Sequence, residues 1–460
     1  MNILIAPNAM KGSLSAFEMA DAIEAGLQKA GLFDITKLPV ADGGDGTARV
    51  LANVLGASFV HCTVLDPLLR EIDSGFYLDD KNVAIIEMAD ASGMKLLAAN
   101  ELLPLKTSSF GTGQLVKLAS EHGAKTIWLC VGGSATVDAG MGALMALGVK
   151  FFSSDGELTL GNGESMAKVD SFDALAANKL LQAVSIKIIS DVKNPLLGEN
   201  GAVAVFAPQK GASYQQLKVL EKGMLLFAKT ISQQTGCSIS ALEGGGAAGG
   251  IAAAFAALFN AQIVDGAQFV LEKTGFYDLA LHADLIITGE GKVDNSTLMG
   301  KAPGAILAFG TVIDKPVYVI CGINSLSVPN RFKQIVLITS KIENLKETMS
   351  KAFENVVKSA FVLGENLKVD IDYNHALAAF ENNEIEKSLL MVDQLIELDK
   401  MNTDLLLLKA KIKFKQQNWR ETLNLLNAIL EVDANNELAQ NYKKMVMDIL
   451  VFWNKDNYNP

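Results

Sequence analysis

Short runs of apolar, often β-branched residues recur along most of the chain, with helical patterns between them. Within each run the apolar residues are continuous instead of alternating with polar ones, which favours strands buried on both faces of a sheet. The clearest strand predictions cover residues 3–6, 83–88, 126–131, 186–189, 285–288, 317–321 and 335–338. Strands of this kind, alternating with helices, predict an α/β fold.

The first predicted helix has clear start and stop signals. Ser15 and Glu18 have the spacing of a capping box, in which each side chain accepts a hydrogen bond from the other residue's backbone N–H. Apolar residues recur at helical spacing from Leu14 to Leu27, and Gly31 ends the pattern. The chain therefore opens with a strand, a loop and a helix.

The composition changes near Gly364. Glycine is frequent before this position and absent after it, where Leu, Asn, Glu and Lys dominate. A shift of 34 residues places Phe380 on Phe414, Leu389 on Leu423, Ile396 on Leu430, Glu397 on Glu431 and Asp399 on Asp433. Paired amphipathic helices with this period resemble the tetratricopeptide repeat. About two repeats fit, fewer than usually stand alone, so we expect them to pack on the rest of the chain or on another chain.

The bulk composition is that of a folded, acidic protein. Half of the 460 residues are apolar and 20% are charged, which builds packed cores over about three domains. The net charge of -11 repels a phosphate backbone, so we expect no nucleic-acid partner. A small anionic substrate remains compatible with this charge, because local lysines and helix N-termini bind anions.

Cysteine usage and the N-terminus bear on the compartment. The four cysteines and four histidines are scattered, so we expect buried reduced thiols and no zinc site. The N-terminus lacks a basic stretch followed by a long apolar run, which argues against a signal peptide. The longest apolar runs, such as residues 251–259, are too short to cross a bilayer. We therefore expect a cytoplasmic protein that does not associate with membranes.

Turns that combine glycine with charged residues follow several of the predicted strands, where open α/β sheets bind ligands. The first turn, APNAMKGS, places Lys11 where a cation can meet a phosphate or carboxylate, although the lysine could equally be a solvated loop residue. The second, ADGGDGT, holds Asp42 and Asp45 in a tight loop. These acids suit a cation or a substrate hydroxyl, and the alternative is an ordinary acidic turn.

The third turn, VGGSATVDAGMG, directly follows the predicted strand TIWLCV and opens a helix. Gly132 and Gly133 allow backbone N–H groups to approach an anion, which the helix dipole also favours. Ser134 and Thr136 add hydroxyl donors. A helix cap without any ligand is the alternative interpretation.

The fourth and fifth turns supply further acids and lysines. In SDVKNPLLGENGA, Asp191 stands at the end of the strand IKIIS, a position that suits a general base or a magnesium ligand. The chain continues to APQKGA, which contains Lys210. The fifth turn, TGEGKVDNSTLMGKAP, has two acids and two lysines that could hold magnesium and phosphate together, or form a charged surface loop. They are Glu290, Lys292, Asp294 and Lys301.

Absent motifs narrow the function. No GxxxxGK[ST] occurs, so the chain is not a P-loop enzyme, and the protein-kinase, GxSxG and HExxH motifs are missing too. A glycine run at residues 244–250 is equally compatible with a phosphate-binding turn and a close-packed helix start. These residues indicate an α/β enzyme suited to phosphoryl transfer, but they do not identify the acceptor.

The same turns, in this order, resemble the bacterial glycerate kinase family, which is unrelated to P-loop kinases. APNAMKGSLSA is similar to the family's APDSFKxSLSA, ADGGDGT to ADGGEGT, and GGSATVDAGMG to GGSATNDGGxG. SDVKNPLLGENGA resembles DVxNPLxGxxGA, FAPQKGA resembles FGPQKGA, and TGEGKVDNSTLMGKAP resembles TGEGxxDxQTxxGKAP. The resemblance covers residues 1–340. It implies transfer of the γ-phosphoryl group of ATP to D-glycerate with magnesium, with 2-phosphoglycerate as the product.

The chain also departs from the family pattern. Asn8, Ala9 and Met10 replace the Asp-Ser-Phe of the usual opening, and Val137 and Ala139 replace Asn and Gly. An essential base at position 8 would be lost in this chain. We therefore expect one of the other carboxylates, Asp191 or Asp42, to act as the base.

The resemblance implies a two-lobed architecture, in which lobe closure over a central cleft excludes water. We expect a Rossmann-like α/β lobe at residues 1–66 and 271–363, an inserted α/β lobe at 67–270, and the helical repeats at 364–460. The repeats offer a surface for a protein partner or for self-association.

Roles follow from the resemblance as expectations. Asp191 takes the proton of the glycerate hydroxyl, and the candidate magnesium ligands are Asp42, Glu290 and Asp294. The groups expected to neutralise or bind phosphate or carboxylate are Lys11, Lys210, Lys292, Lys301, Ser134, Thr136, Gly132 and Gly133. Two alternatives remain: a kinase of another small hydroxy acid, and a non-catalytic kinase-like scaffold for the repeats, which the changes at positions 8–10 motivate.

Overall fold

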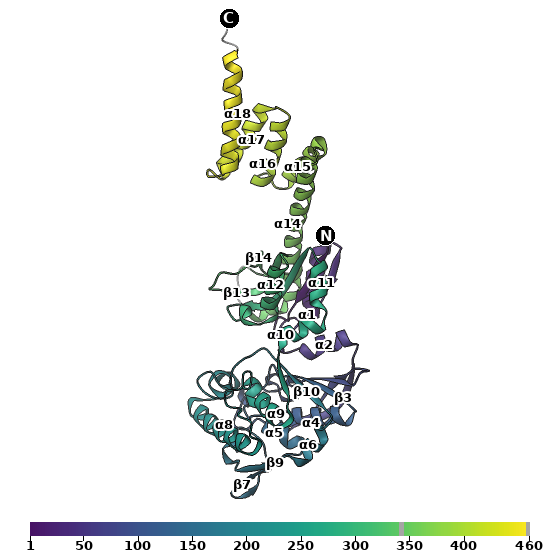
Figure 1. Ribbon diagram of the computed structural model, residues 1–460, viewed down its shortest axis with the longest axis vertical. Coiled ribbons are helices and arrows are strands. Elements are labelled where there is room, and N and C mark those ends of the chain that lie inside the picture. The colour runs from purple at the N-terminus through teal and green to yellow at the C-terminus, as the bar shows by residue number, and fades with distance from the viewer. Residues whose placement is uncertain (340–344, 457–460) are drawn as a thin grey trace. The chain divides into compact units, whose positions relative to one another are not determined.

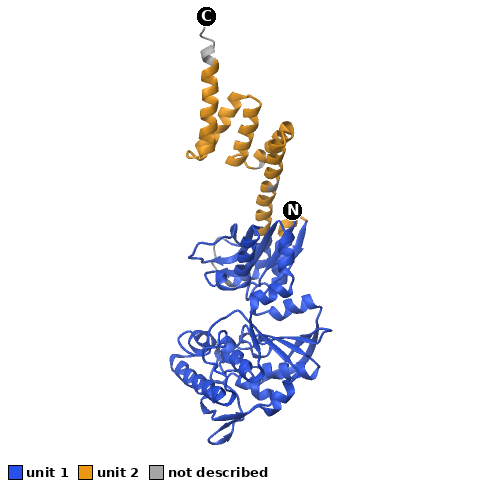
Figure 2. Ribbon diagram, in the orientation of Figure 1, with its two compact units in different colours: residues 1–25, 34–359 blue, residues 26–33, 360–460 orange. Residues whose placement is uncertain are grey.

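The structure is a computed structural model that describes residues 1–339 and 345–456. The chain forms two compact units, which Figure 2 distinguishes by colour. The first unit contains residues 1–25 and 34–359, and the second contains residues 26–33 and 360–460. In the part of the chain that the structure describes, no helix has both the length and the apolar character needed to cross a bilayer.

The first unit contains a five-stranded sheet whose strands are all parallel. Its strands, in spatial order, are β14 (Gln334–Leu337), β13 (Val317–Asn324), β12 (Leu285–Val293), β1 (Ile3–Pro7) and β2 (Ile35–Lys37). The helices that follow these strands or lead into them are α1 (Ala16–Lys29), α2 (Thr47–Leu55), α10 (Gly266–Lys273), α11 (Phe276–His282), α12 (Ala302–Val312) and α13 (Leu345–Ser350).

A second sheet of the same unit has six strands, of which four are parallel. In spatial order they are β11 (Gln262–Asp265), β10 (Ser185–Ser190), β6 (Thr126–Cys130), β5 (Val83–Glu87), β4 (Glu71–Leu78) and β3 (Ser58–Leu65). The last two strands form an antiparallel hairpin at the edge. Figure 1 shows the helices gathered around this sheet. They are α3 (Ala89–Ser92), α4 (Phe110–Glu121), α5 (Met141–Ala146), α6 (Leu175–Leu181), α7 (Ala202–Phe206), α8 (Tyr214–Thr235) and α9 (Ile251–Phe259).

A small antiparallel sheet completes the strands of this unit. It consists of β8 (Gly156–Glu157), β7 (Lys150–Ser153) and β9 (Ser171–Asp173), with β7 in the centre. All seven strands expected from the apolar runs are present, and the α/β fold class is confirmed. The other strands are short or lie at sheet edges, where the sequence pattern is weak.

The central strands of the six-stranded sheet, β5, β6 and β10, are largely buried on both faces, as their continuous apolar runs predict. Side chains alternate along β6, so Ile127 and Leu129 join one apolar core while Trp128 and Cys130 join another. The second of these cores also contains residues of β1, β12 and β13 of the five-stranded sheet. A single apolar cluster therefore connects the two sheets within the unit.

The capping box at the first helix is confirmed. The backbone N–H of Glu18 donates to Ser15 Oγ at 3.2 Å, and the backbone N–H of Ser15 donates to Glu18 Oε2 at 2.8 Å. Helix α1 ends at Lys29, and Gly31 follows with a left-handed φ of 88°. The start and stop of this helix are thus determined by local sequence signals.

The C-terminal part of the chain is helical. The long helix α14 (Ala352–Glu381) is followed by α15 (Ile385–Leu398), α16 (Thr403–Lys415), α17 (Trp419–Val432) and α18 (Glu437–Asp456), as Figure 1 shows. Helices α15 and α17 begin 34 residues apart, as do α16 and α18. From α15 to α18, each helix packs on the next in sequence. The 34-residue period of the sequence therefore equals the spacing between the starts of alternate helices.

Gly364 lies inside α14, and the change of composition there does not end a helix. A Cβ at this position would lie 2.7 Å from the Cβ of Ala30, so the helix passes close to the end of α1. The expected start of a separate segment at residue 364 and the expected lobe boundaries at 66/67 and 270/271 stay predictions. The change from one sheet to the other falls between Lys37 and Ser58, and again between Asp265 and Leu285.

Candidate functional site

The turns singled out from the sequence lie at the carboxyl ends of parallel strands. Lys11 follows β1, Ser134 follows β6, and Asp191 follows β10 directly. Glu290 lies on β12, which continues to Val293 beyond the predicted end at residue 288. Since the carboxyl ends of parallel strands share one edge of a sheet, each sheet gathers its own turns at one edge.

The backbones of three of these turns touch each other. The N–H of Gly132 donates to the carbonyl oxygen of Gly43 at 3.1 Å. A Cβ on Gly132 would lie 2.5 Å from Gly44 Cα, and a Cβ on Gly43 would lie 3.0 Å from Ser190 Cα. Glycine is needed at these positions because no side chain fits between the backbones. The ADGGDGT turn is therefore held against the turns that carry Ser134 and Asp191.

Replacing Gly132 by alanine should lower the melting temperature, because its added Cβ would meet backbone atoms of Gly43 and Gly44 at 2.8 and 2.5 Å. Overpacking of this kind typically costs about 1–3 kcal/mol. Thermal unfolding monitored by circular dichroism measures the effect. The matched control is Gly223→Ala on α8, where the nearest atoms would lie at 3.3 Å and alanine favours the helix. Equal melting temperatures for Gly132→Ala and the unchanged chain would contradict the close contact.

Asp42 is almost fully buried and lies at the centre of the charged groups. The amide of Asn8 donates to Asp42 Oδ2 at 2.8 Å, and the N–H of Gly44 donates to Oδ1 at 3.2 Å. Burial, together with the Asp42 carboxylate, raises the pKa of Asp191, while Lys11 and Lys301 oppose this shift. These four charged groups are therefore close enough to act on one another electrostatically.

Glu290, which lies near Asp42, and Asp294 have pKa values that are shifted in opposite directions. Burial raises the pKa of Glu290 to about 7, although the hydroxyl of Thr297 donates to its Oε1 at 2.6 Å and opposes the shift. The hydroxyl of Ser296 and then Lys292 lower the pKa of Asp294 to about 2. Lys292 Nζ lies 3.1 Å from Asp294 Oδ2. Near neutral pH, Glu290 can therefore exchange a proton while Asp294 stays ionised.

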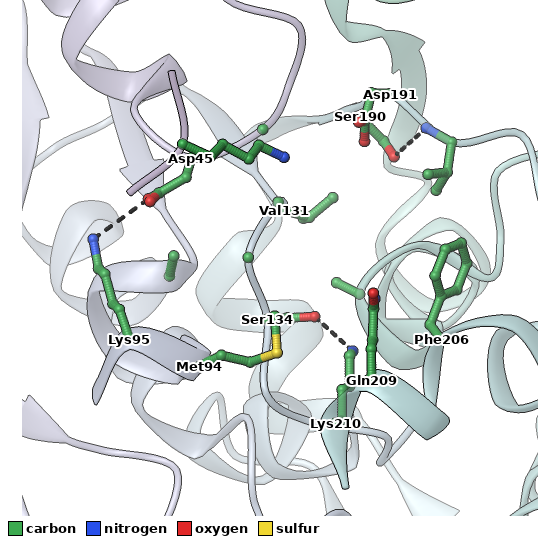
Figure 3. A pocket seen from close by; sticks show the side chains of 17 residues that line it. Asp45, Met94, Lys95, Val131, Ser134, Ser190, Asp191, Phe206, Gln209 and Lys210 are labelled. Carbon is green, nitrogen blue, oxygen red and sulfur yellow. Dashed lines mark hydrogen bonds and ion pairs between the residues drawn. The ribbon is translucent and has the colours of Figure 1, made fainter. Parts of the chain in front are cut away.

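A first cavity of about 490 Å³ opens where these turns meet, and Figure 3 shows it from close by. We call it the Lys210 cavity. The residues predicted from the sequence that line it are Lys11, Gly132, Gly133, Ser134, Asp191 and Lys210. Asp45, Met94, Lys95, Phe206 and Gln209 also face it.

Lys210 is the most deeply buried cation of this cavity, with 3% of its surface exposed. Its ammonium donates to Ser134 Oγ and to the carbonyl oxygen of Thr136, each at 2.8 Å. Burial lowers the pKa of Lys210 to about 7, and the nearby Asp138 carboxylate opposes the shift. An anion placed in this cavity would stabilise the charged form.

Asp138 anchors the turn that holds Lys210 in place. Its carboxylate accepts hydrogen bonds from the backbone N–H groups of Ser109, Gly140 and Gly142, at 2.8, 3.1 and 3.2 Å. The hydroxyl of Ser109 donates to it at 2.7 Å. Asp138 stands in the VGGSATVDAGMG turn, but its role cannot be read from the sequence because its partner Ser109 lies 29 residues away.

Lys210 should make folding stability depend on pH. Its pKa falls from 10.5 to about 7 on folding, so between these values the unfolded chain binds a proton that the folded chain lacks. The free energy of unfolding then rises with pH through this window, by at most about 1.4 kcal/mol per pH unit. We expect the melting temperature of the unchanged chain to rise from about pH 7 to about pH 9 relative to that of Lys210→Met. Equal pH dependence in both proteins would contradict the buried ammonium.

A second cavity of about 350 Å³ contains the remaining charged candidates, and we call it the Met349 cavity. Asp42, Glu290, Lys292 and Lys301 line it, together with Lys11, which also lines the Lys210 cavity. Its other walls are largely apolar and include Met10, Ile323, Ile338, Met349 and Ala352. Lys11 therefore stands where the two cavities meet.

Two of the predicted residues line neither cavity. Thr136 is fully buried, and its hydroxyl has no hydrogen-bond partner within residues 1–339 and 345–456, while its carbonyl accepts from Lys210. Asp294 is engaged by Ser296 and Lys292 beside the Met349 cavity. The glycine run at 244–250 is close-packed, since a Cβ at Gly249 would lie 2.2 Å from the Thr136 carbonyl oxygen. This contact favours the close-packed helix start over a phosphate-binding turn.

Comparisons with known proteins agree on one family. A family model described as the glycerate kinase family matches residues 3–367. Glycerate kinase of Haemophilus influenzae is 40% identical over 326 residues, covering 70% of this chain and 86% of that protein. Glycerate 2-kinase of Escherichia coli K12 is 33% identical over 378 residues, covering 80% of this chain and 98% of that protein.

A solved structure gives the same result for the fold. The crystal structure of a proposed glycerate kinase 2 from Salmonella typhimurium LT2 aligns with a TM-score of 0.70 at 35% identity. The alignment covers 80% of this chain and 99% of that one. Residues 368–460 lie outside the matched family model. From its sequence, its fold and its gathered turns, the chain belongs to the glycerate kinase family.

Proposed function

We propose that the protein is a glycerate kinase that transfers the γ-phosphoryl group of ATP to D-glycerate and releases 2-phosphoglycerate. The observation that carries the proposal is the gathering of Lys11, Asp42, Asp191 and Lys301 beside two cavities that share Lys11. Phosphoryl transfer depends on positioning and charge neutralisation more than on covalent chemistry. Family membership supports the same reaction.

Asp191 is the proposed general base. It is partly buried, and its pKa is raised by burial and by Asp42, which makes the carboxylate a stronger proton acceptor. Lys11 and Lys301 act on the same carboxylate electrostatically, so they lie near the atoms that react. We assign them the neutralisation of charge on the transferring phosphoryl group.

Magnesium is proposed to accompany the nucleotide. Among residues 1–339 and 345–456, no group of three or more His, Cys, Asp or Glu side chains is placed to hold a metal ion. Proteins usually bind Mg²⁺ through one or two carboxylates plus substrate phosphates and water. Asp42 and Glu290, both in the Met349 cavity, have the right donor chemistry. When bound, the ion would neutralise phosphate charge. Asp294, which Ser296 and Lys292 already engage, is the less available ligand.

A product-resolved assay tests the proposed reaction. The purified chain is supplied with ATP, magnesium and D-glycerate, and coupled enzymes distinguish 2-phosphoglycerate from 3-phosphoglycerate. We expect 2-phosphoglycerate and faster turnover with glycerate than with tartronate or lactate. Preference for another hydroxy acid would favour the related-kinase alternative. If none of the three acids raises ATP turnover above the rate measured without an acid, the non-catalytic scaffold is favoured.

The presence of Asn8 was one reason to consider a non-catalytic scaffold, but the contacts of Asn8 argue against this alternative. Its amide donates to Asp42 Oδ2 at 2.8 Å, and its side-chain oxygen accepts from the N–H of Ala9 at 2.8 Å. Asn8 thus fixes one of the site's carboxylates in place. A side chain with this contact is compatible with an active enzyme whose base is Asp191.

For the C-terminal helices we propose tetratricopeptide-like repeats that serve a protein partner or self-association. The 34-residue spacing of the helix starts supports this proposal. Light scattering of the full-length protein tests self-association. A monomer at all concentrations would leave a separate protein partner as the proposed role. We also propose that the protein acts in the cytoplasm.

A further inference from the structure

The two cavities have different chemical linings, and Lys11 is common to both. A group that bridges two cavities can contact both ligands during transfer. A lysine shared in this way is a candidate contact for the transferring phosphoryl group. Each cavity can then be matched to one substrate by its lining.

The Lys210 cavity has one deeply buried cation that is not matched by an ion pair. Two of the three ammonium N–H groups of Lys210 donate to Ser134 Oγ and to the Thr136 carbonyl oxygen, which leaves one N–H for a ligand. The Asp138 carboxylate nearby already accepts four hydrogen bonds. A buried ammonium is stabilised by an anion that donates nothing and accepts strongly, as a carboxylate does.

Lys95, another lysine of this cavity, is already neutralised. Lys95 Nζ lies 2.6 Å from Asp90 Oδ1 and 3.5 Å from Asp45 Oδ1, and Figure 3 shows its pairing with Asp45. The cavity therefore offers Lys210 and the shared Lys11 to a ligand. A buried ammonium with one free N–H suits the single carboxylate of a small acid.

The Met349 cavity also combines apolar and charged side chains, but none of its lysines is as deeply buried as Lys210. Apolar side chains of Met10, Ile323, Ile338 and Met349 form walls that suit the flat, apolar faces of a nucleoside base. Lys301 and Lys11 lie beside them, with the carboxylates of Asp42 and Glu290. Cations for a polyphosphate and carboxylates for its magnesium ion are thus present in the same cavity.

We propose that the acceptor acid binds in the Lys210 cavity with its carboxylate on Lys210, and that the nucleotide occupies the Met349 cavity. This inference rests on the proposed function. Asp191 lines the Lys210 cavity, where the acceptor hydroxyl must lie for this carboxylate to take its proton. The acceptor oxygen forms a bond to the γ-phosphorus, the bond to the β–γ bridging oxygen breaks, and ADP leaves with that electron pair.

The assignment makes Lys210 the residue that recognises the negative charge of the acceptor. The test compares Lys210→Met with the unchanged enzyme on two substrates, D-glycerate and glyceramide. Glyceramide keeps the hydroxyl groups of glycerate but lacks its negative charge. The variant should raise the KM for D-glycerate by about 10- to 100-fold and leave the KM for ATP within about twofold. The preference of the unchanged enzyme for glycerate over glyceramide should largely disappear in the variant.

The nucleotide half is tested by Ile323→Trp. Ile323 lines the Met349 cavity and is 38% exposed, so a larger side chain can obstruct the cavity without disturbing the core. This variant should raise the KM for ATP at least about tenfold and leave the KM for D-glycerate within about twofold.

The matched control for Lys210→Met is Lys222→Met. Lys222 is an exposed lysine on α8 that lines neither cavity.

The assignment would be overturned if Lys210→Met changed only the KM for ATP, or if Ile323→Trp changed only the KM for D-glycerate. It would also be overturned if Lys210→Met kept the preference for glycerate over glyceramide. If Lys210→Met fails to fold, Lys210→Arg keeps the charge and should keep the preference. Loss of the preference in a folded Lys210→Arg enzyme would refute the assignment. If the unchanged enzyme turns over no glycerate, the proposed function fails. In that case, the rise in melting temperature on adding D-glycerate tests the binding site. Loss of this rise in Lys210→Met would support binding at Lys210, and an unchanged rise would refute it.

Discussion

Replacing Asp191 by asparagine should lower the kcat for D-glycerate by about 100- to 10,000-fold, the usual contribution of a general base. The amide keeps the shape of the side chain but takes up no proton at neutral pH. Asp191 directly follows β10 and lines the Lys210 cavity, and its raised pKa reflects burial and the Asp42 carboxylate. Steady-state kinetics with the product-resolved assay measure the change.

Asp265→Asn is the matched control for this prediction. Asp265 ends the adjacent parallel strand β11, and its Oδ1 accepts from the N–H of Gln268 at 3.0 Å as the N-cap of α10. Asparagine caps helices as well as aspartate does, so folding and turnover should be nearly unchanged. A folded Asp191→Asn enzyme with near-normal kcat would show that another group takes the proton.

The second large effect is expected for Lys11→Met, which should lower kcat by about 100- to 1,000-fold. Lys11 lines both cavities and opposes the raised pKa of Asp191, so its charge acts where the phosphoryl group is transferred. Charge that develops in the transition state is stabilised most by a cation already in position. The measurement is kcat with both substrates saturating.

The control for Lys11→Met is Lys193→Met, which removes an exposed lysine from the turn two residues after Asp191. Lys193 lines neither the Lys210 cavity nor the Met349 cavity, so its loss should change kcat less than about twofold. Equal losses in the two variants would mean that Lys11 acts through the overall charge of the region. In that case its proposed place between the cavities would be wrong.

The fold was largely predictable where local patterns are strong. Continuous apolar runs marked the buried parallel strands, because a strand covered on both faces cannot alternate with polar residues. The hairpin of β3 and β4 was not predicted, since its residues show no continuous apolar run. The length of α14 was also missed. Gly364, where the composition changes, lies inside this helix and allows a close approach to Ala30.

The site was predictable as a set of turns, but the contacts within it were not. Spacing identified Lys11, Asp42 and Asp191, because each stands in a glycine-containing turn or directly after a strand. Thr297, which donates to Glu290, lies inside the TGEGKVDNSTLMGKAP turn, but nothing in the local sequence indicates this contact. The contact of Asn8 with Asp42 joins residues 34 positions apart, so only the folded chain shows it.

The central claim is that turns dispersed along the chain form one site for a nucleotide and a small acid. A crystal structure of Asp191→Asn with a non-hydrolysable ATP analogue, magnesium and D-glycerate tests it most directly. We expect the terminal phosphate at Lys11, the nucleobase beside Met349 and Ile323, and the glycerate carboxylate on Lys210. Both ligands bound away from Lys11, or each bound at a separate sheet edge, would contradict it.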